Sequence, residues 1–221
     1  MESPRSAPLQ KAPGLDRDFL RFPSFAVTGG GGTVSLHRVH RSHHNPGWYS
    51  SGEGGRFNLD IPRGTLYAAN SVQTCVRELL GPRLAGGGVV VRSQVEGRSV
   101  SKIDLPVERA ADFCSPAALS HGVIPGEISG PFPNYEIPRA WAAAMDDAGF
   151  GGIRYQSRFT AGTGGEWCLA AFGCAGAGEV HVQETISARA AVREMTELTM
   201  VEIPRDTELR IVPLDGDSAG P

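Results

Sequence analysis

Residues 53–81 bring one cation, one aromatic ring and one carboxylate into a single stretch: Arg56, Tyr67 and Glu78. The guanidinium of arginine is a planar fork of donors that suits phosphate oxygens. A carboxylate can stabilise a developing cation or orient an attacking nucleophile. A tyrosine ring can stack on a flat ligand while its hydroxyl forms a hydrogen bond. Taken alone, the three residues fit an ordinary strand and helix with surface charges equally well.

The segment around Arg56 is richer in arginine than in acids. Between residues 36 and 63 the chain has four arginines and two acids: Arg38, Arg41, Arg56 and Arg63, with Glu53 and Asp60. The whole chain has a net charge of −3. A local cationic patch on a mildly acidic protein suits an anionic small molecule better than a nucleic acid. For each arginine taken singly, a surface ion pair is the alternative.

Several other chemistries have little support in the sequence. Four histidines crowd one segment (His37, His40, His43 and His44). Tetrahedral zinc needs three or four converging ligands, and strand alternation places His37 and His40 on opposite faces, so we expect no metal site. The glycine runs at 29–32 and 86–88 match neither a P-loop nor a Rossmann fingerprint. The chain has no G-x-S-x-G nucleophile motif.

Short strands dominate the elements that must position the candidate residues. Alternating or apolar runs predict strands at 34–41, 64–69, 88–96, 99–105, 151–157, 166–173 and 179–185, with further edge strands in "LTMVEI" and "TELRIVP". We expect 88–96 and 99–105 to pair as a hairpin or meander, and 106–138 to be irregular. In the strand 34–41 we expect Val34, Leu36 and Val39 to point inward. Many short strands with few helices predict an α+β sandwich.

The helix that carries Glu78 has clear limits. Ser71 is a good N-cap, and Gly81 with Pro82 ends the helix. Its apolar residues recur at helical spacing: Val72, Cys75, Val76 and Leu79. At 100° per residue, Glu78 falls at the edge of this stripe and can border a cleft. A second helix is predicted over 138–150.

The ends of the chain differ from its middle. Residues 1–32 are rich in Pro, Ser and Gly and predict a flexible N-terminal arm, and 215–221 predict a disordered tail, so the folded domain is expected at 33–214. No apolar run reaches the ~20 residues of a membrane span, and the first residues contain no apolar core, so we expect no secretion signal. The four cysteines form no C-x-x-C pair and are expected to be reduced thiols. A cytoplasmic location is the expectation.

The order of five short pieces resembles the RES domain family, which is named after an Arg, a Glu and a Ser. The pieces are "LHR" (36–38), "GGRFN" (54–58), "TLYAA" (65–69), "SVQTCVRELLG" (71–81) and "GGIRYQSRF" (151–159). The resemblance covers residues 34–185. Phe57 stands where the family more often has Trp, and the chain is longer than the compact members.

The resemblance implies an ADP-ribosyltransferase-like fold, a split β-sandwich around an NAD cleft, with a few flanking helices. It implies a toxin-like enzyme that degrades NAD⁺ with water or phosphate as the acceptor. By position, Arg38, Arg56 and Tyr67 would bind NAD⁺, and Tyr49 offers a second aromatic wall. Glu78, Arg56 and Ser157 would be catalytic, with Ser157 also binding the ligand.

The same resemblance implies which partners to expect. NAD⁺ would be the substrate, with no permanently bound cofactor. A helix-turn-helix antitoxin is a possible partner, and nucleic acid and membrane are not expected. Transfer of ADP-ribose to a protein acceptor is the main alternative activity. The sequence leaves the acceptor, the antitoxin and the oligomeric state open.

Overall fold

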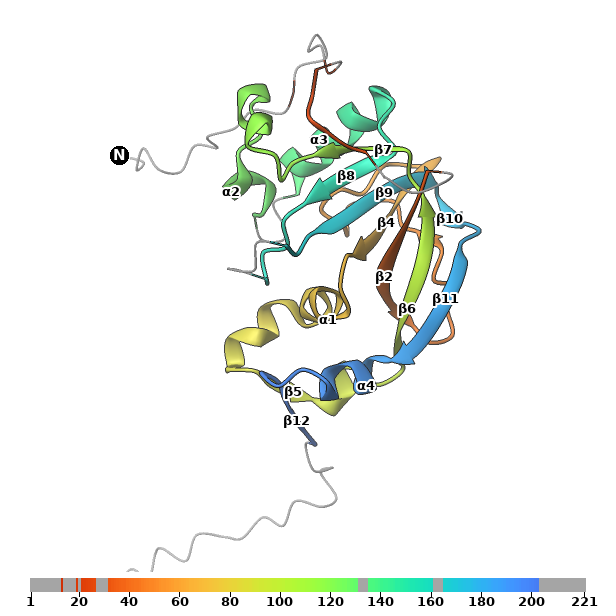
Figure 1. The fold of residues 1–221 in the computed structure, drawn as a ribbon, viewed down its shortest axis with the longest axis vertical. Helices are drawn as coiled ribbons and strands as arrows, with labels where there is room; N and C mark the ends of the chain where they lie inside the picture. Colours follow the sequence, from red (N-terminus) through yellow and green to blue (C-terminus); the bar gives the residue numbers. More distant parts are fainter. Residues whose placement is uncertain are drawn as a thin grey trace, which may run out of the picture.

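An eight-stranded mixed sheet forms the frame of the protein (Figure 1). The computed structural model describes residues 13, 19, 21–26, 32–130, 135–160 and 165–202. The strands lie in the order β1-β7-β8-β9-β4-β2-β6-β11. Their bounds are β1 Ser24–Ala26, β2 Thr33–Arg41, β4 Arg63–Ala69, β6 Arg98–Pro106, β7 Arg109–Asp112, β8 Gly152–Tyr155, β9 Cys168–Cys174 and β11 His181–Ser187.

The sheet is split in its middle. β4 pairs with β9 over its whole length, and β2 pairs with β6 over its whole length. In contrast, β2 and β4 share a single register pair, His37 opposite Ala69. The frame therefore consists of two half-sheets, β1-β7-β8-β9-β4 and β2-β6-β11, that part beyond this pair. The predicted α+β class and split sheet are confirmed.

Two apolar clusters hold the half-sheets in place. The inner cluster is made mostly of strand residues from both half-sheets, with Leu36 and Ile103 on one side and Leu66 and Leu169 on the other. The half-sheets therefore pack against each other through it. Val34 and Leu36 belong to the inner cluster, but Val39 packs into the other cluster. The expectation that Val34, Leu36 and Val39 all point to one side of the sheet is wrong for Val39, because odd and even positions of a strand face opposite sides.

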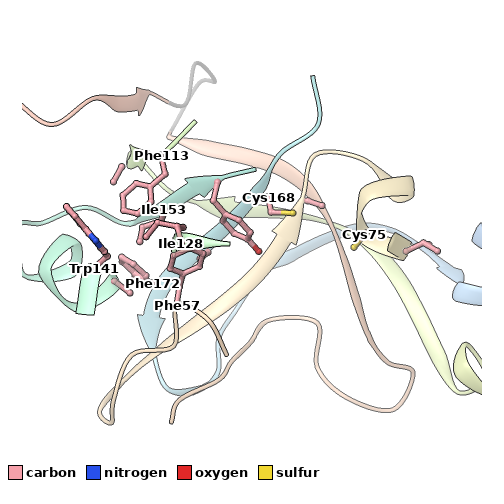
Figure 2. Close-up of a cluster of buried hydrophobic side chains, with 14 of the residues drawn as sticks. Phe57, Cys75, Phe113, Ile128, Trp141, Ile153, Cys168 and Phe172 are labelled. Atoms are coloured by element: carbon pink, nitrogen blue, oxygen red, sulfur yellow. The ribbon is translucent and has the colours of Figure 1, made fainter. Parts of the chain in front are cut away.

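The second, helix-side cluster lies between the sheet and the helices. The helices are α1 (Val72–Leu80), α2 (Pro125–Ile128), α3 (Glu136–Asp147) and α4 (Ala188–Arg193), with 3₁₀ turns η1 (Gly81–Gly86), η2 (Arg92–Gln94) and η3 (Pro116–His121). Trp141 of α3 packs near Phe113 and Phe57 at one end of this cluster, and Cys168 and Cys75 lie at the other (Figure 2). α3 contacts β8, α1 contacts β2 and β4, and α4 contacts β6 and β11.

The helix that carries Glu78 forms as predicted. The Ser71 hydroxyl accepts a hydrogen bond from the backbone N–H of Thr74, and α1 ends at Gly81. Val76 and Leu80 are fully buried on the apolar side of α1. The predicted helix at 138–150 is present as α3 but begins two residues earlier, at Glu136.

Two small sheets complete the fold and correct the predicted hairpin. β10 (Gly176–Ala177) pairs with β3 (Trp48–Tyr49). β5 (Val89–Val91) pairs in parallel with β12 (Thr199–Val201), so it is not a hairpin partner of β6. The turn η2 separates β5 from β6, because Gln94 bonds back to the N–H of Val91 and curls the chain. The segment 106–138, expected to be irregular, contains β7 and short helical turns.

Part of the predicted N-terminal arm belongs to the folded domain. β1 pairs with β7, and Phe22 is only 4% exposed. The reason is aromatic packing, since the Phe22 ring lies 5.5 Å from that of Phe113 and 6.3 Å from that of Trp141. The expectation of a loose arm is therefore wrong for residues 21–26. The tail at 215–221 and the edge strand expected in "TELRIVP" lie outside the described residues, and the domain limits 33 and 214 stay predictions.

No helix within the described ranges is long and apolar enough to cross a membrane.

Candidate active site

A pocket of about 330 Å³ opens where the two half-sheets part. Val39 of β2 and Ala69 of β4 line it from either side of the split. Glu78 lines it from α1, and the loop Gly54–Gly55–Arg56 closes one wall. The volume falls at the low end of the usual range for small-molecule sites, about 300–1,000 Å³.

Glu78 and Ser157 meet in this region. The Ser157 hydroxyl donates a hydrogen bond of 2.5 Å to Oε1 of Glu78. The same hydroxyl accepts the backbone N–H of Phe159 at 3.1 Å, and Ser157 is only 2% exposed. The short bond fixes the carboxylate, because a donor to a charged acceptor forms a strong, directional contact. Within the described residues, Oε2 of Glu78 accepts no hydrogen bond.

Arg56 stands in the pocket wall between two tyrosines. Its guanidinium carbon lies 5.9 Å from the ring centres of both Tyr135 and Tyr155. Arg56 is 8% exposed, and its Nε has no hydrogen-bond partner. No carboxylate of the described residues pairs with it. The two acids nearest in sequence, Glu53 and Asp60, pair with Arg139 of α3 instead.

The other arginines of the segment have different surroundings. Arg63 pairs with Asp146 at 2.6 Å, so the surface ion pair is the right description of that residue. Arg38 donates to the backbone oxygen of Trp48 at 2.8 Å, while its Nε and Nη1 are buried without partners. Burial lowers the pKa of Arg38 to about 10.

The hydroxyl of Tyr67 is engaged inside the protein. It accepts the backbone N–H of Phe57 at 2.8 Å and donates to Oδ1 of Asn58 at 3.0 Å. Gly55 makes room for this arrangement, since a Cβ there would lie 2.7 Å from the Tyr67 oxygen and 2.2 Å from the Asn58 oxygen. The ring of Tyr67 lines the pocket, and burial raises the pKa of its phenol. Tyr67 therefore holds the loop that carries Arg56.

Arg38 and Tyr49 lie apart from the residues that line the pocket. Arg38 neighbours Val39 in β2, so strand alternation turns its side chain to the opposite face. Tyr49 packs against the inner cluster, and its phenol pKa is raised by burial against the opposing charge of Arg38. The structure thus brings Arg56, Tyr67, Glu78 and Ser157 together, and it leaves Arg38 and Tyr49 outside the pocket lining.

Three pocket residues had no place in the predicted site: Arg98, Tyr135 and Tyr155. Tyr155 stands inside the quoted segment "GGIRYQSRF", where the strand pattern marks it only as a strand residue. The two cysteines of the pocket, Cys75 and Cys168, are buried, and burial raises the pKa of both thiols. A thiol that keeps its proton is a poor nucleophile.

The histidines of residues 40–44 contact protein groups. His40 Nε2 lies 2.8 Å from the Ser101 hydroxyl, and its Nδ1 lies 2.9 Å from the Arg41 backbone oxygen. The rings of His43 and His44 contact each other edge to face. In the described part of the chain, no group of three His, Cys, Asp or Glu side chains could hold a metal ion.

Comparisons with known proteins identify the fold and the family. The model of the RES domain family matches residues 35–194. A chain in the crystal structure of the M. tuberculosis MbcT-MbcA toxin-antitoxin complex superposes with a TM-score of 0.55 and 16% identity, over 74% of this chain and 88% of that one. At this identity the likeness concerns the fold alone. No curated protein sequence matches the chain.

Proposed function

Since the chain belongs to the RES domain family, we propose that it degrades NAD⁺ by cleaving the bond between nicotinamide and ribose. The contact between Ser157 and Glu78 carries the proposal, because it places an oriented carboxylate in a pocket of suitable size. Water or phosphate would be the acceptor, and NAD⁺ would be a substrate, with no resident cofactor.

The proposed reaction needs no covalent bond between the protein and the substrate. When the C1′–N bond breaks, its electron pair stays on the nicotinamide, which leaves neutral, and positive charge develops on the ribose. An oxygen of water or phosphate then bonds to C1′, and water loses a proton. A fixed carboxylate stabilises the developing charge by electrostatics alone. Glu78 would do this with Oε2, while Ser157 holds Oε1 in place.

The remaining residues would bind the ligand. Arg56 has no carboxylate partner among the described residues, so its charge is available for a phosphate oxygen of NAD⁺. Tyr67, Tyr135 and Tyr155 would supply aromatic walls. The sequence also predicted Arg38 and Tyr49 as NAD⁺ ligands. They lie outside the pocket lining, so only a part of the ligand that extends beyond the pocket would contact them.

A biological role as the toxin of a toxin–antitoxin pair is part of the proposal. The similar solved chain comes from a toxin–antitoxin complex, and the family match agrees with that context. A helix-turn-helix antitoxin is the expected partner, and the cytoplasm is the expected location.

The test is an NAD⁺ assay on the full-length chain with product analysis. We expect free nicotinamide together with ADP-ribose in water or ADP-ribose 1″-phosphate in phosphate buffer. Label transferred from NAD⁺ to protein would instead indicate a transferase. Glu78→Gln should abolish turnover, and Glu194→Gln, at an exposed glutamate outside the pocket, should not. Absence of nicotinamide release by the wild type would refute the proposal.

A further inference from the structure

Arg98 lines the pocket from the half-sheet opposite to that of Tyr155 and has no part in the function described so far. It is the first residue of β6, where the chain leaves the turn at Gly97, whose φ is +68°. None of the described carboxylates forms an ion pair with it. After Arg56, Arg98 is thus a second cation of the pocket without an ion pair among the described residues.

A third cation stands beside Arg98. Arg41, the last residue of β2, is directly opposite Arg98 in the antiparallel register. Directly opposed residues share one face of a sheet, and this is the face of Val39, which lines the pocket two residues before Arg41. Arg41 is exposed and also lacks an ion pair within the described residues. Like charges in this position destabilise a sheet unless an anion lies between them.

We propose that Arg41 and Arg98 form an anion subsite at the rim of the pocket that binds a phosphate group. Two planar guanidinium forks on adjacent strands can grip several oxygens of one phosphate at once. The pocket then has cations on both walls, with Arg56 on the loop of one half-sheet and Arg98 on the other. Glu78, whose negative charge repels anions, lines the same pocket.

The phosphate can come from two sources of the same chemistry. It is either inorganic phosphate that acts as the acceptor or the diphosphate of the substrate itself. The inference rests on the proposed function for the identity of the ligand, but phosphate binding can be measured without turnover. Failure of the subsite and failure of the enzyme activity are therefore separate results.

The first experiment measures binding of inorganic phosphate and of ADP to the full-length protein by calorimetry. Losing a charge-assisted contact should raise the dissociation constant of Arg98→Gln about tenfold or more, and Arg41→Gln should raise it less because that side chain is exposed. Arg98→Lys should give an intermediate value, since it keeps the charge but lacks the fork. Arg83→Gln is the matched control and should bind like the wild type, because Arg83 of η1 is exposed and forms no ion pair in the described part of the chain. The inference is wrong if the wild type binds neither anion, or if the Arg41→Gln, Arg98→Gln double variant binds both normally.

The second experiment identifies the source of the phosphate from NAD⁺ cleavage at varied phosphate concentration. If the subsite holds the acceptor, Arg98→Gln raises the phosphate concentration needed for half-maximal rate, shifts the product toward ADP-ribose and leaves KM for NAD⁺ unchanged. If it holds the substrate diphosphate, KM for NAD⁺ rises even without added phosphate. A protein that binds phosphate through Arg98 but never releases nicotinamide would refute the proposed enzyme and keep the subsite.

Discussion

Replacement of Tyr67 by Phe tests whether this tyrosine serves the loop that carries Arg56 or the ligand. The substitution removes a single oxygen, which accepts the N–H of Phe57 at 2.8 Å and donates to Oδ1 of Asn58 at 3.0 Å. Phe57 is 0% exposed and Asn58 is 4% exposed, so water cannot replace the lost partner at either atom. The change therefore leaves two buried polar groups without hydrogen bonds.

The expected loss of stability follows from these two groups. An unsatisfied buried donor or acceptor costs about 1–3 kcal/mol, so we expect the free energy of unfolding to fall by about 3 kcal/mol. For a domain of this size that corresponds to a drop in Tm of roughly 6–12 °C. Tyr49→Phe is the matched control, because the Tyr49 hydroxyl has no hydrogen bond in the described structure; its Tm should stay within about 2 °C of the wild type.

Differential scanning calorimetry of the wild type and both variants gives the answer. Asn58→Ala removes the other end of the same contact, so the double variant with Tyr67→Phe should lose less stability than the sum of the single variants. A Tyr67→Phe protein with the Tm of the wild type would refute the reasoning. If NAD⁺ turnover also fell in that protein, the hydroxyl would be a ligand contact and not a loop anchor.

Three further predictions concern the carboxylate and the buried thiols. Ser157→Ala should lower kcat for NAD⁺ cleavage about tenfold with little change in KM, because Glu78 loses the donor that fixes it; a change in KM alone would contradict this. Iodoacetamide at about pH 8 should label the exposed Cys174 and spare Cys75 in the folded protein, as peptide mass spectrometry can show, because burial raises the pKa of Cys75 to about 12. Labelling of both at equal rates would be the contrary result. Since the Cys75 thiol has a pKa of 9.0 when unfolded and about 12 when folded, its contribution to stability is complete below pH 9 and is lost as pH rises toward 12. In urea titrations, Cys75→Ala should therefore lose less stability than the wild type above pH 9, and parallel curves would contradict the assignment.

The parts of the fold that the sequence predicts well are those whose signals are local. Ser71, the apolar spacing that follows it and Gly81 define α1, since a cap, a stripe and a stop lie within one short stretch. The strand at 64–69 has the same advantage. The pairing of β5 with β12 could not be predicted in this way, because its partners are 110 residues apart in the register Thr199 to Val89. Nothing in the sequence of either strand indicates which strand it pairs with.

The candidate site was predicted in part for a related reason. Helical spacing places Glu78 at the edge of the apolar stripe of α1, and the structure places it in the pocket wall. Its contact with Ser157 joins residues 79 positions apart and could be expected only from the family resemblance. The engagement of the Tyr67 hydroxyl was beyond prediction, because it depends on the close approach of Asn58 to Gly55.

Arg38 and Arg98 show how strand register decides which cations reach the pocket. The predicted hairpin placed Arg98 in a connecting turn, where an arginine is ordinarily solvated. In the structure β6 begins at Arg98 and pairs along β2, so residue 98 shares the face of Val39 and Arg41. Arg38, one residue before Val39, shares the opposite face. A shift of the β2–β6 register by one residue would place Arg98 opposite His40 or Ser42, on the face of Arg38 and away from that of Val39. Residue type alone therefore cannot choose between them. Because the observed register turns Arg98 and not Arg38 toward the pocket, Arg98→Gln should weaken binding of phosphate more than Arg38→Gln does.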